Sequence, residues 1–88
     1  MPDETERQEI LELELEGTSI VDVANRDAAI KDLAQQTEGF AGADLASLVE
    51  QAKLHALEEN TDGGLKWDSL LSMLESTRAF RLAQESPV

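Results

Sequence analysis

Two small residues, Gly42 and Ala43, stand where a long amphipathic helix is expected to begin. A helix start presents main-chain N–H groups and the positive end of the helix dipole. With almost no side chain in the way, an anionic or planar group could approach the backbone at this point. The same residue types also build an ordinary tight corner between two helices. The residue types alone therefore leave a ligand-facing helix start and a structural corner as alternatives.

Motifs that would supply catalysis are missing from the sequence. There is no G-x-x-x-x-G-K-[ST] loop to cradle phosphates and no apolar run ending in Asp-Glu to hold magnesium. His55 is the only histidine and the chain has no cysteine, so the imidazole lacks partners for a metal site or a general base. We expect His55 to be a surface or edge residue, and we expect the chain by itself to have no catalytic residue and no metal site.

Two further motifs match known sites only in part. An EF-hand-like calcium loop would need a bidentate Glu at Ser69, although residues of suitable type stand at its earlier positions, Glu58, Asn60, Asp62 and Gly63. The run Asp68-Ser69-Leu70 is similar to the phosphopantetheine-bearing motif of acyl carrier proteins. That serine should open the second helix near mid-chain, whereas Ser69 lies close to the end of this one. We expect an acidic turn in the first case and an ordinary helix in the second.

Length and charge restrict the class of protein. The 88 residues suit one domain, and the absence of cysteine excludes a disulfide framework. Seven basic against 19 acidic residues give a formal net charge of −12, which argues against a nucleic-acid or anionic-membrane binder. No apolar run approaches the length of a membrane span. A strongly acidic surface suits a halophilic, cytoplasmic protein, because concentrated salt screens the repulsion; it also permits a basic partner.

The hydrophobic pattern predicts four helices. The first begins after Asp3, with Glu6 as the reciprocal member of a capping box, and ends at Gly17. Ile20, Val21 and Val23 are expected to pin the connector 18–25 to the core. The second helix begins at Asn25 or Asp27 and ends before Gly39, whose residue type suits a positive φ.

The third predicted helix is the longest and the most apolar. Its apolar residues recur at helical spacing, with a second apolar line beside them at Leu54 and Leu57. A helix that is apolar over a wide arc should be central and should contact neighbours on more than one side. The run 65–70 starts a fourth helix, and we expect Trp67 within it to be a buried core residue. The fold class is therefore all-α, a small four-helix bundle over residues 1–88.

A family resemblance rests on these elements. The run 37–45, T-E-G-F-A-G-A-D-L, resembles the T-E-G-F-S-G-A-D-L signature of AAA ATPases. The opening P-D-E-x-x-R-x-E-I-L of the chain is similar to the start of their small helical lid domain. The likeness is to the branch that contains valosin-containing protein and the proteasomal ATPases, and it covers most of the chain.

The resemblance implies a function for several residues. In this family adenine and ribose lie between a large core domain and the lid, and the matching positions here are Gly42 and Ala43. A histidine of the first lid helix often faces the base, and Glu14 stands at that position. The resemblance thus implies a lid that binds ATP or ADP, with magnesium supplied by a core domain that this chain lacks. The chain would then be an accessory fragment of a larger ATPase.

The resemblance also implies partners. The lid of this family packs against its own core domain and against the neighbouring subunit of a hexameric ring, and it relays motion driven by ATP hydrolysis. The usual work of such a ring is the remodelling of client proteins. The alternative is a free-standing acidic helical module whose third helix receives a partner helix in a groove.

Overall fold

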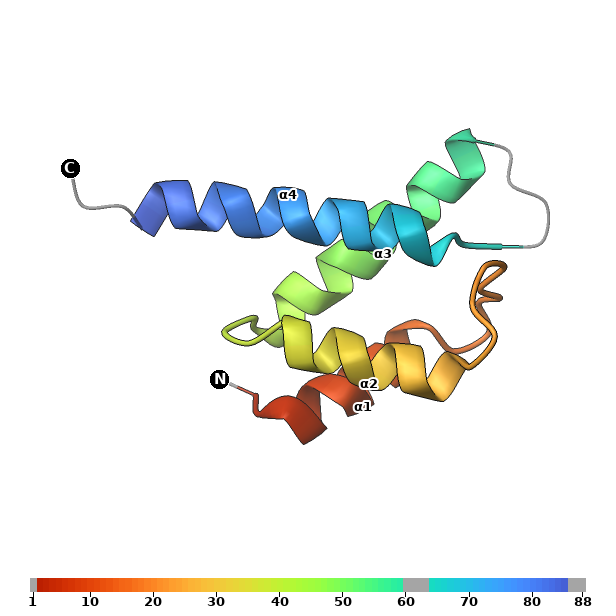
Figure 1. The fold of residues 1–88 in the computed structure, drawn as a ribbon, viewed down its shortest axis with the longest axis horizontal. Helices are drawn as coiled ribbons and strands as arrows, with labels where there is room; N and C mark the ends of the chain where they lie inside the picture. Colours follow the sequence, from red (N-terminus) through yellow and green to blue (C-terminus); the bar gives the residue numbers. More distant parts are fainter. Residues whose placement is uncertain (1, 60–63, 86–88) are drawn as a thin grey trace.

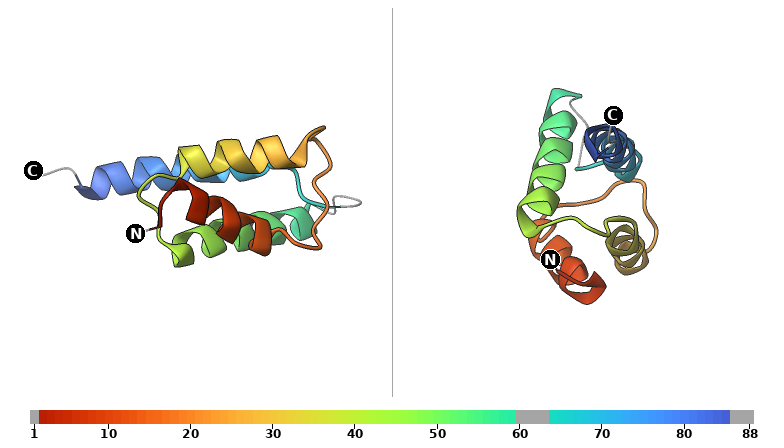
Figure 2. Two further views of the ribbon diagram at one scale, coloured as in Figure 1. Left: turned by 90° about the horizontal axis from the view of Figure 1, so that it is seen from below. Right: turned by 90° about the vertical axis from the view of Figure 1, so that its left-hand side faces the viewer.

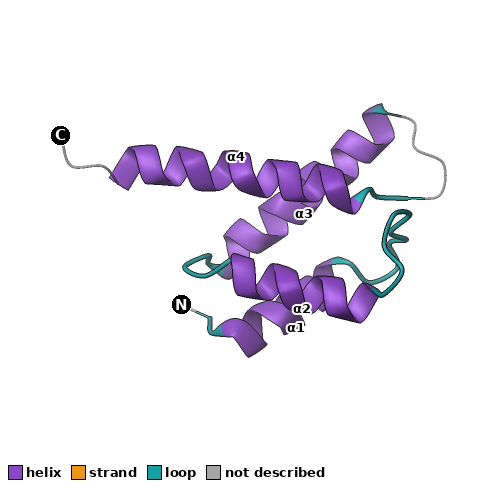
Figure 3. Cartoon of the chain, viewed as in Figure 1, coloured by secondary structure: helices purple, strands orange, loops and turns teal. Residues whose placement is uncertain are grey.

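The chain folds into four α-helices in a computed structural model that describes residues 2–59 and 64–85, with side chains described to residue 78. The helices are α1 (Glu4–Glu14), α2 (Arg26–Gln36), α3 (Gly42–Glu58) and α4 (Trp67–Glu85) (Figures 1 and 3). The prediction of a small all-α fold of four helices is therefore confirmed.

The starts of the first two helices follow the expected local chemistry. The carboxylate of Asp3 accepts the N–H of Glu6 at 2.8 Å, and the Glu6 carboxylate accepts the N–H of Asp3 at 3.2 Å. This reciprocal pair is the predicted capping box. The side chain of Asn25 accepts the N–H of Ala28 at 3.0 Å and so caps α2. Each cap satisfies N–H groups that have no partner inside the helix.

Helix α3 is the central element of the bundle. It packs against α1 and against α4, while α2 packs against α1. Figure 1 shows α1 and α2 on one side and α4 (blue) on the other, with α3 (green) running obliquely behind α4 from beside the end of α2. Figure 2 shows the same arrangement from two further directions. The core contains apolar residues from all four helices and the segments between them: Leu11, Leu15, Ile30, Leu33, Ala34, Phe40, Leu45, Leu48, Val49, Ala52, Leu65, Trp67, Leu70 and Leu74.

The second apolar line of α3 remains at the surface. Leu54 is 52% exposed and Leu57 is 77% exposed. Leu13 on α1, at 69%, is also exposed. The central place of α3 is thus confirmed, but its apolar arc is wider than the two neighbouring helices cover.

The connector between α1 and α2 contacts the start of α4. Ile20 and Leu65 form a single parallel β-bridge, in which Leu65 N–H donates to Ser19 O at 2.8 Å and Val21 N–H donates to Leu65 O at 3.0 Å. Ile20 and Val23 pack against the core, as predicted. The expectation for Val21 was wrong, because its side chain is 46% exposed. Val21 lies in a turn that begins directly after the bridge residue Ile20, so its side chain does not share the inward direction of Ile20.

Arg7 and Thr37 are the buried polar residues of the described chain. Arg7 lies in α1 and donates from Nε to the carbonyl of Ala34 and from a terminal nitrogen to that of Pro2, each at 2.9 Å. A buried guanidinium costs free energy unless its N–H groups find acceptors. Arg7 therefore links the N-terminal part of α1 to the last turn of α2.

Candidate functional site

The corner before α3 is built by three residues. Thr37 is fully buried, and its hydroxyl donates to the carbonyls of Leu33 at 2.9 Å and Ala34 at 3.2 Å. Gly39 has a φ of +87°, a conformation that costs glycine little, as the sequence predicted. Phe40 is buried in the core, and its N–H donates to Thr37 O at 3.0 Å. These contacts fix where the chain enters α3.

The start of α3 is open to solvent at the predicted residues. Ala43 is exposed and Gly42 is half-buried. A methyl group added at Gly42 would meet Ile10 Cδ1 of α1 at 3.7 Å, an ordinary van der Waals distance. The carboxylate of Asp44 accepts the N–H of Ala41 at 2.9 Å and so occupies part of the helix start. The N–H groups of Gly42 and Ala43 belong to the first turn, where intrahelical partners are missing.

Glu14 lies along the same contact between α1 and α3. It follows Ile10 by four residues, so it stands one turn, roughly 6 Å, further along the same face of α1. Glu14 is half-buried, and its carbonyl accepts a hydrogen bond from Lys53 Nζ of α3 at 2.8 Å. Gly42 and Glu14 therefore both lie along the α1–α3 contact, but Glu14 lies beside Lys53, which is 11 residues after Gly42 and so roughly 16 Å further along α3.

The cations around this contact bind main-chain oxygens. Lys53 donates to the Glu14 carbonyl, and the guanidinium of Arg26 donates to the carbonyls of Leu15 and Thr18. Arg7 does the same at the other end of α1. These roles were not predicted, because the sequence does not show which carbonyls a folded backbone leaves for a distant side chain. The carboxylate of Asp44 thus makes the start of α3 acidic.

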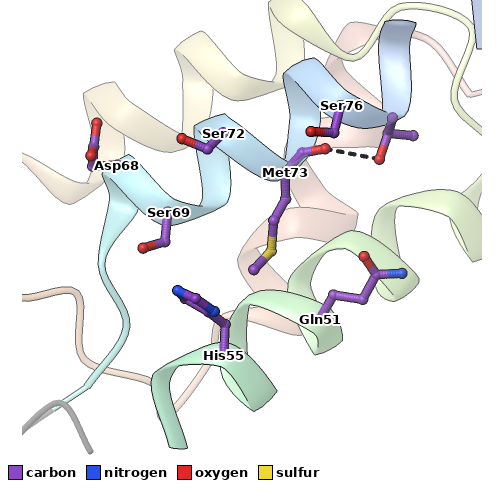
Figure 4. A pocket seen from close by; sticks show the side chains of 8 residues that line it. Gln51, His55, Asp68, Ser69, Ser72, Met73 and Ser76 are labelled. Carbon is purple, nitrogen blue, oxygen red and sulfur yellow. Dashed lines mark hydrogen bonds between the residues drawn. The ribbon is translucent and has the colours of Figure 1, made fainter. Parts of the chain in front are cut away.

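A polar groove of about 340 Å³ lies between α3 and α4. Figure 4 shows His55 of α3 facing Ser69 of α4 and the side chain of Met73 pointing towards α3. Around them the lining is mostly hydroxyl, amide and carboxylate, with the Thr77 hydroxyl donating to the Met73 carbonyl at 2.9 Å. His55 Nε2 pairs with Glu59 at 3.0 Å, and its side chain is 38% exposed, so it is the edge residue expected.

The remaining sequence motifs give no further site in the described residues. Asn60, Asp62 and Gly63 of the calcium-like loop lie outside the described part of the chain. Within residues 2–59 and 64–85 no three metal-ligating side chains converge.

None of the helices in that part has the length and apolar character needed to cross a membrane. Trp67 is buried in the core, as predicted.

Asp22 of the connector has an unexpected role at the start of α4. Its carboxylate accepts the N–H of Trp67 at 2.7 Å and that of Asp68 at 3.1 Å. Partial loss of hydration acts to raise the pKa of Asp22, but these hydrogen bonds, one from its own N–H and the charge of Lys66 outweigh it and lower the pKa below 3.8. The carboxylate is therefore held ionised as a cap.

Comparison with known proteins agrees with this architecture. The family model of the AAA+ lid domain matches residues 27–72. The chain is 44% identical over 62 residues to ATP-dependent zinc metalloprotease FtsH 2 of Petrotoga mobilis, covering 70% of this chain and 9% of that protein. It is 37% identical over 79 residues to meiotic spindle formation protein mei-1 of Caenorhabditis elegans, covering 90% and 16%. A cell division cycle protein 48 homolog of Archaeoglobus fulgidus is 34% identical over 64 residues, covering 73% and 8%.

The chain belongs to the AAA+ lid domain family. The family expected from the run 37–45 and the start of the chain is thus confirmed. The chain spans less than a fifth of the length of these relatives. Membership in an AAA ATPase family implies nucleotide binding in the full protein.

Proposed function

We propose that this chain is the lid of an AAA ATPase, where it completes a nucleotide pocket and relays movement driven by ATP hydrolysis. The observation that carries the proposal is the open start of α3, where exposed Ala43 and half-buried Gly42 lie beside α1. A second domain could approach main-chain groups there without displacing a large side chain. Family membership supports the same role.

The charge around the start of α3 favours the adenosine end of the nucleotide. The carboxylate of Asp44 stands at this helix start, and a triphosphate would be repelled by it. An adenine or ribose is uncharged and offers N–H and O–H groups that a carboxylate can accept. We therefore assign Gly42, Ala43 and Glu14 to adenosine contact, and we assign the phosphates of ATP or ADP and their Mg²⁺ to a core domain.

The proposed partners are the lid's own core domain, a neighbouring subunit of a hexameric ring and the protein clients that the ring remodels in the cytoplasm. Leu54 and Leu57 support docking to a further domain, because they leave apolar surface exposed towards the C-terminal end of α3. Gly42 and Leu57 are 15 residues apart on one helix, which separates the two ends by roughly 22 Å. Nucleotide contact and docking would thus use different ends of α3.

An amide-shift titration tests the nucleotide proposal. ADP should move the amide signals of Gly42 and Ala43 first, at millimolar concentration because the lid supplies only part of the pocket. Adenosine should reproduce these shifts, whereas inorganic pyrophosphate should leave them unchanged. Shifts with pyrophosphate alone would contradict the adenosine assignment, and no shift at α3 with ADP would contradict nucleotide contact.

The second candidate function is a free-standing acidic module that binds a partner helix. The exposed Leu54 and Leu57 favour it as well, since i, i+3 leucines suit a helix-in-groove contact. The groove between α3 and α4 does not favour it, because its lining is mainly polar. This function would leave the start of α3 unaffected by ADP, so the same titration separates the two.

We also propose that the acidic surface adapts the protein to concentrated salt. The net charge of −12 produces repulsion that a short Debye length screens. Raising KCl from about 0.1 M to about 1 M, where the screening length falls to about 3 Å, should therefore raise the midpoint of thermal unfolding. An unchanged or lower midpoint would contradict the halophilic assignment.

A further inference from the structure

Helix α4 is held to the rest of the domain at two places. Among the described helices only the main chain of α3 runs close to that of α4, while Leu70 and Leu74 of α4 are buried in the common core. Its other attachment is the connector clasp, which we define as residues 19–22 together with residues 64–68. Crossing angles of packed helix pairs scatter by roughly 15–20° about their preferred values, so one helix–helix contact does not by itself dictate a single direction. The second attachment is therefore the one able to fix the direction of α4.

The clasp is built from main chain on both sides. The two hydrogen bonds of the Ile20–Leu65 bridge join the segments, and Gly64 lies so close that a Cβ there would stand 2.2 Å from Ser19 O. Gly64 also has a φ of +145°, which other residues rarely adopt. The approach thus requires glycine. The Asp22 carboxylate then completes the clasp across 45 positions of sequence at the N–H of Trp67.

The contact between α3 and α4 is incompletely filled beside this clasp. The groove of about 340 Å³ separates the two helices along one side and is lined by short polar side chains such as Ser69 and Ser72. Close-packed apolar side chains resist a change of crossing angle, whereas a solvated groove resists it less. The groove side of the contact therefore restrains the direction of α4 less than the side on which Leu70 and Leu74 are buried.

We propose that the connector clasp is a mechanical coupling that carries movement of the α1–α2 pair to α4. The connector joins α1 directly to α2, so a shift of this pair moves Asp22 and the bridge with it. The clasp passes that movement to the first turn of α4 across α3. Without the clasp, α4 turns about its contact with α3 while α1, α2 and α3 keep their arrangement.

The alternative role for Asp22 is that of a simple helix cap. Lys66 precedes α4 in the sequence and offers no side-chain acceptor there, so α4 lacks a local cap. The substitution Lys66→Ser would supply one. In the double variant Asp22→Ala/Lys66→Ser the first turn regains an acceptor, but the carboxylate link to the connector is absent. This variant separates capping from coupling.

The test compares the parent chain, the double variant, whose net charge equals the parent's, and the control Glu50→Ala, which removes one carboxylate from an exposed residue of α3 as Asp22→Ala removes one from the connector. In the parent and the control, residual dipolar couplings of all four helices should fit one alignment tensor. In the double variant the α4 couplings should need a tensor of their own, and hydrogen exchange at Val21 and Leu65 should accelerate by about tenfold or more.

Two results would overturn the proposal. The first is a double variant whose four helices still share one tensor with slow exchange at Val21 and Leu65, since Asp22 would then be only a cap. The second is an equal acceleration of exchange in α1 and α4, since the clasp would then stabilise the whole domain without coupling its parts. Asp22→Ala alone should behave like the double variant, with additional fraying at Trp67 and Asp68.

Discussion

Helices α1 and α4 both begin on an aspartate carboxylate, but the two carboxylates come from different distances along the chain. Asp3 caps α1 from the adjacent position, with Glu6 as its reciprocal partner. Asp22 caps α4 from the connector, across 45 positions of sequence. The first cap can form as soon as one helical turn forms. The second requires the connector and the start of α4 to have met, so it reports tertiary structure.

The substitution expected to weaken the attachment between the connector and the start of α4 most is Gly64→Ala. The new Cβ would stand 2.2 Å from Ser19 O at a φ of +145°, so the bridge to the connector would have to separate. We expect a loss of about 3 kcal/mol in the free energy of unfolding, measured by urea denaturation. Gly17→Ala is the matched control. Gly17 also has a positive φ, but a Cβ added there would meet no other atom within 4 Å. Equal losses in both variants would show that backbone strain, and not the close approach, sets the effect.

Removal of the Asp22 carboxylate should have the next largest effect. Asp22→Ala deletes the acceptor for two N–H groups, and we expect a loss of about 1.5 kcal/mol at neutral pH. The folded pKa of Asp22 is lowered, so its contribution is complete above the unfolded pKa of about 3.9 and is lost as pH falls through the folded value.

The difference in unfolding free energy between the parent and Asp22→Ala should therefore be constant at pH 5–7 and should shrink below about pH 4. Paired denaturation curves across this range measure it, since the other carboxylates cancel between the two proteins. A difference that stays constant down to about pH 2 would show that the ionised carboxylate is not its source.

Removal of the local cap of α1 should change the free energy of unfolding least among these three substitutions. Asp3→Ala leaves the N–H of Glu6 to water, and we expect a loss of about 1 kcal/mol. Hydrogen exchange should accelerate in the first turn of α1 and remain unchanged at Leu65 and Trp67. Faster exchange at the start of α4 in this variant would contradict the separation between local and non-local caps.

The parts of the fold that the sequence predicted are those set by neighbouring residues. Asp3 with Glu6, Asn25 before α2 and Gly39 before α3 each act within a few positions, so their residue types predict the helix boundaries. The spacing of apolar residues also predicted that α3 is central. Trp67 was predicted to be buried because it stands beside apolar residues at a helix start.

The parts that were not predicted depend on contacts across the chain. Asp22 as the cap of α4 and Arg7 as a donor to the Ala34 carbonyl both need the fold before their partners exist. Val21 was misplaced because three apolar residues in a connector do not reveal which faces inward. Leu54 and Leu57 widened the predicted apolar arc of α3, but the periodicity of a helix does not state how much of that arc its neighbours cover.

The candidate site was predictable only as residue types at a helix start. The run 37–45 located Gly42 and Ala43, and the structure adds that Ala43 is exposed and that Ile10 is the neighbour of Gly42. The position of Glu14 one turn beyond Ile10 followed from the helical repeat. The hydrogen bonds of Lys53 and Arg26 to main-chain carbonyls could not be derived from spacing.

The most direct test of the lid assignment is an ADP titration of two matched variants, Ala43→Glu and Ala28→Glu, followed by amide shifts. Both alanines are exposed and both lie in the first turn of a helix, so each substitution adds the same charge and bulk at an equivalent place. If Gly42 and Ala43 contact adenosine, Ala28→Glu keeps the ADP-dependent shift of Gly42 and Ala43→Glu loses it. Equal responses in the two variants would contradict adenosine contact at the start of α3.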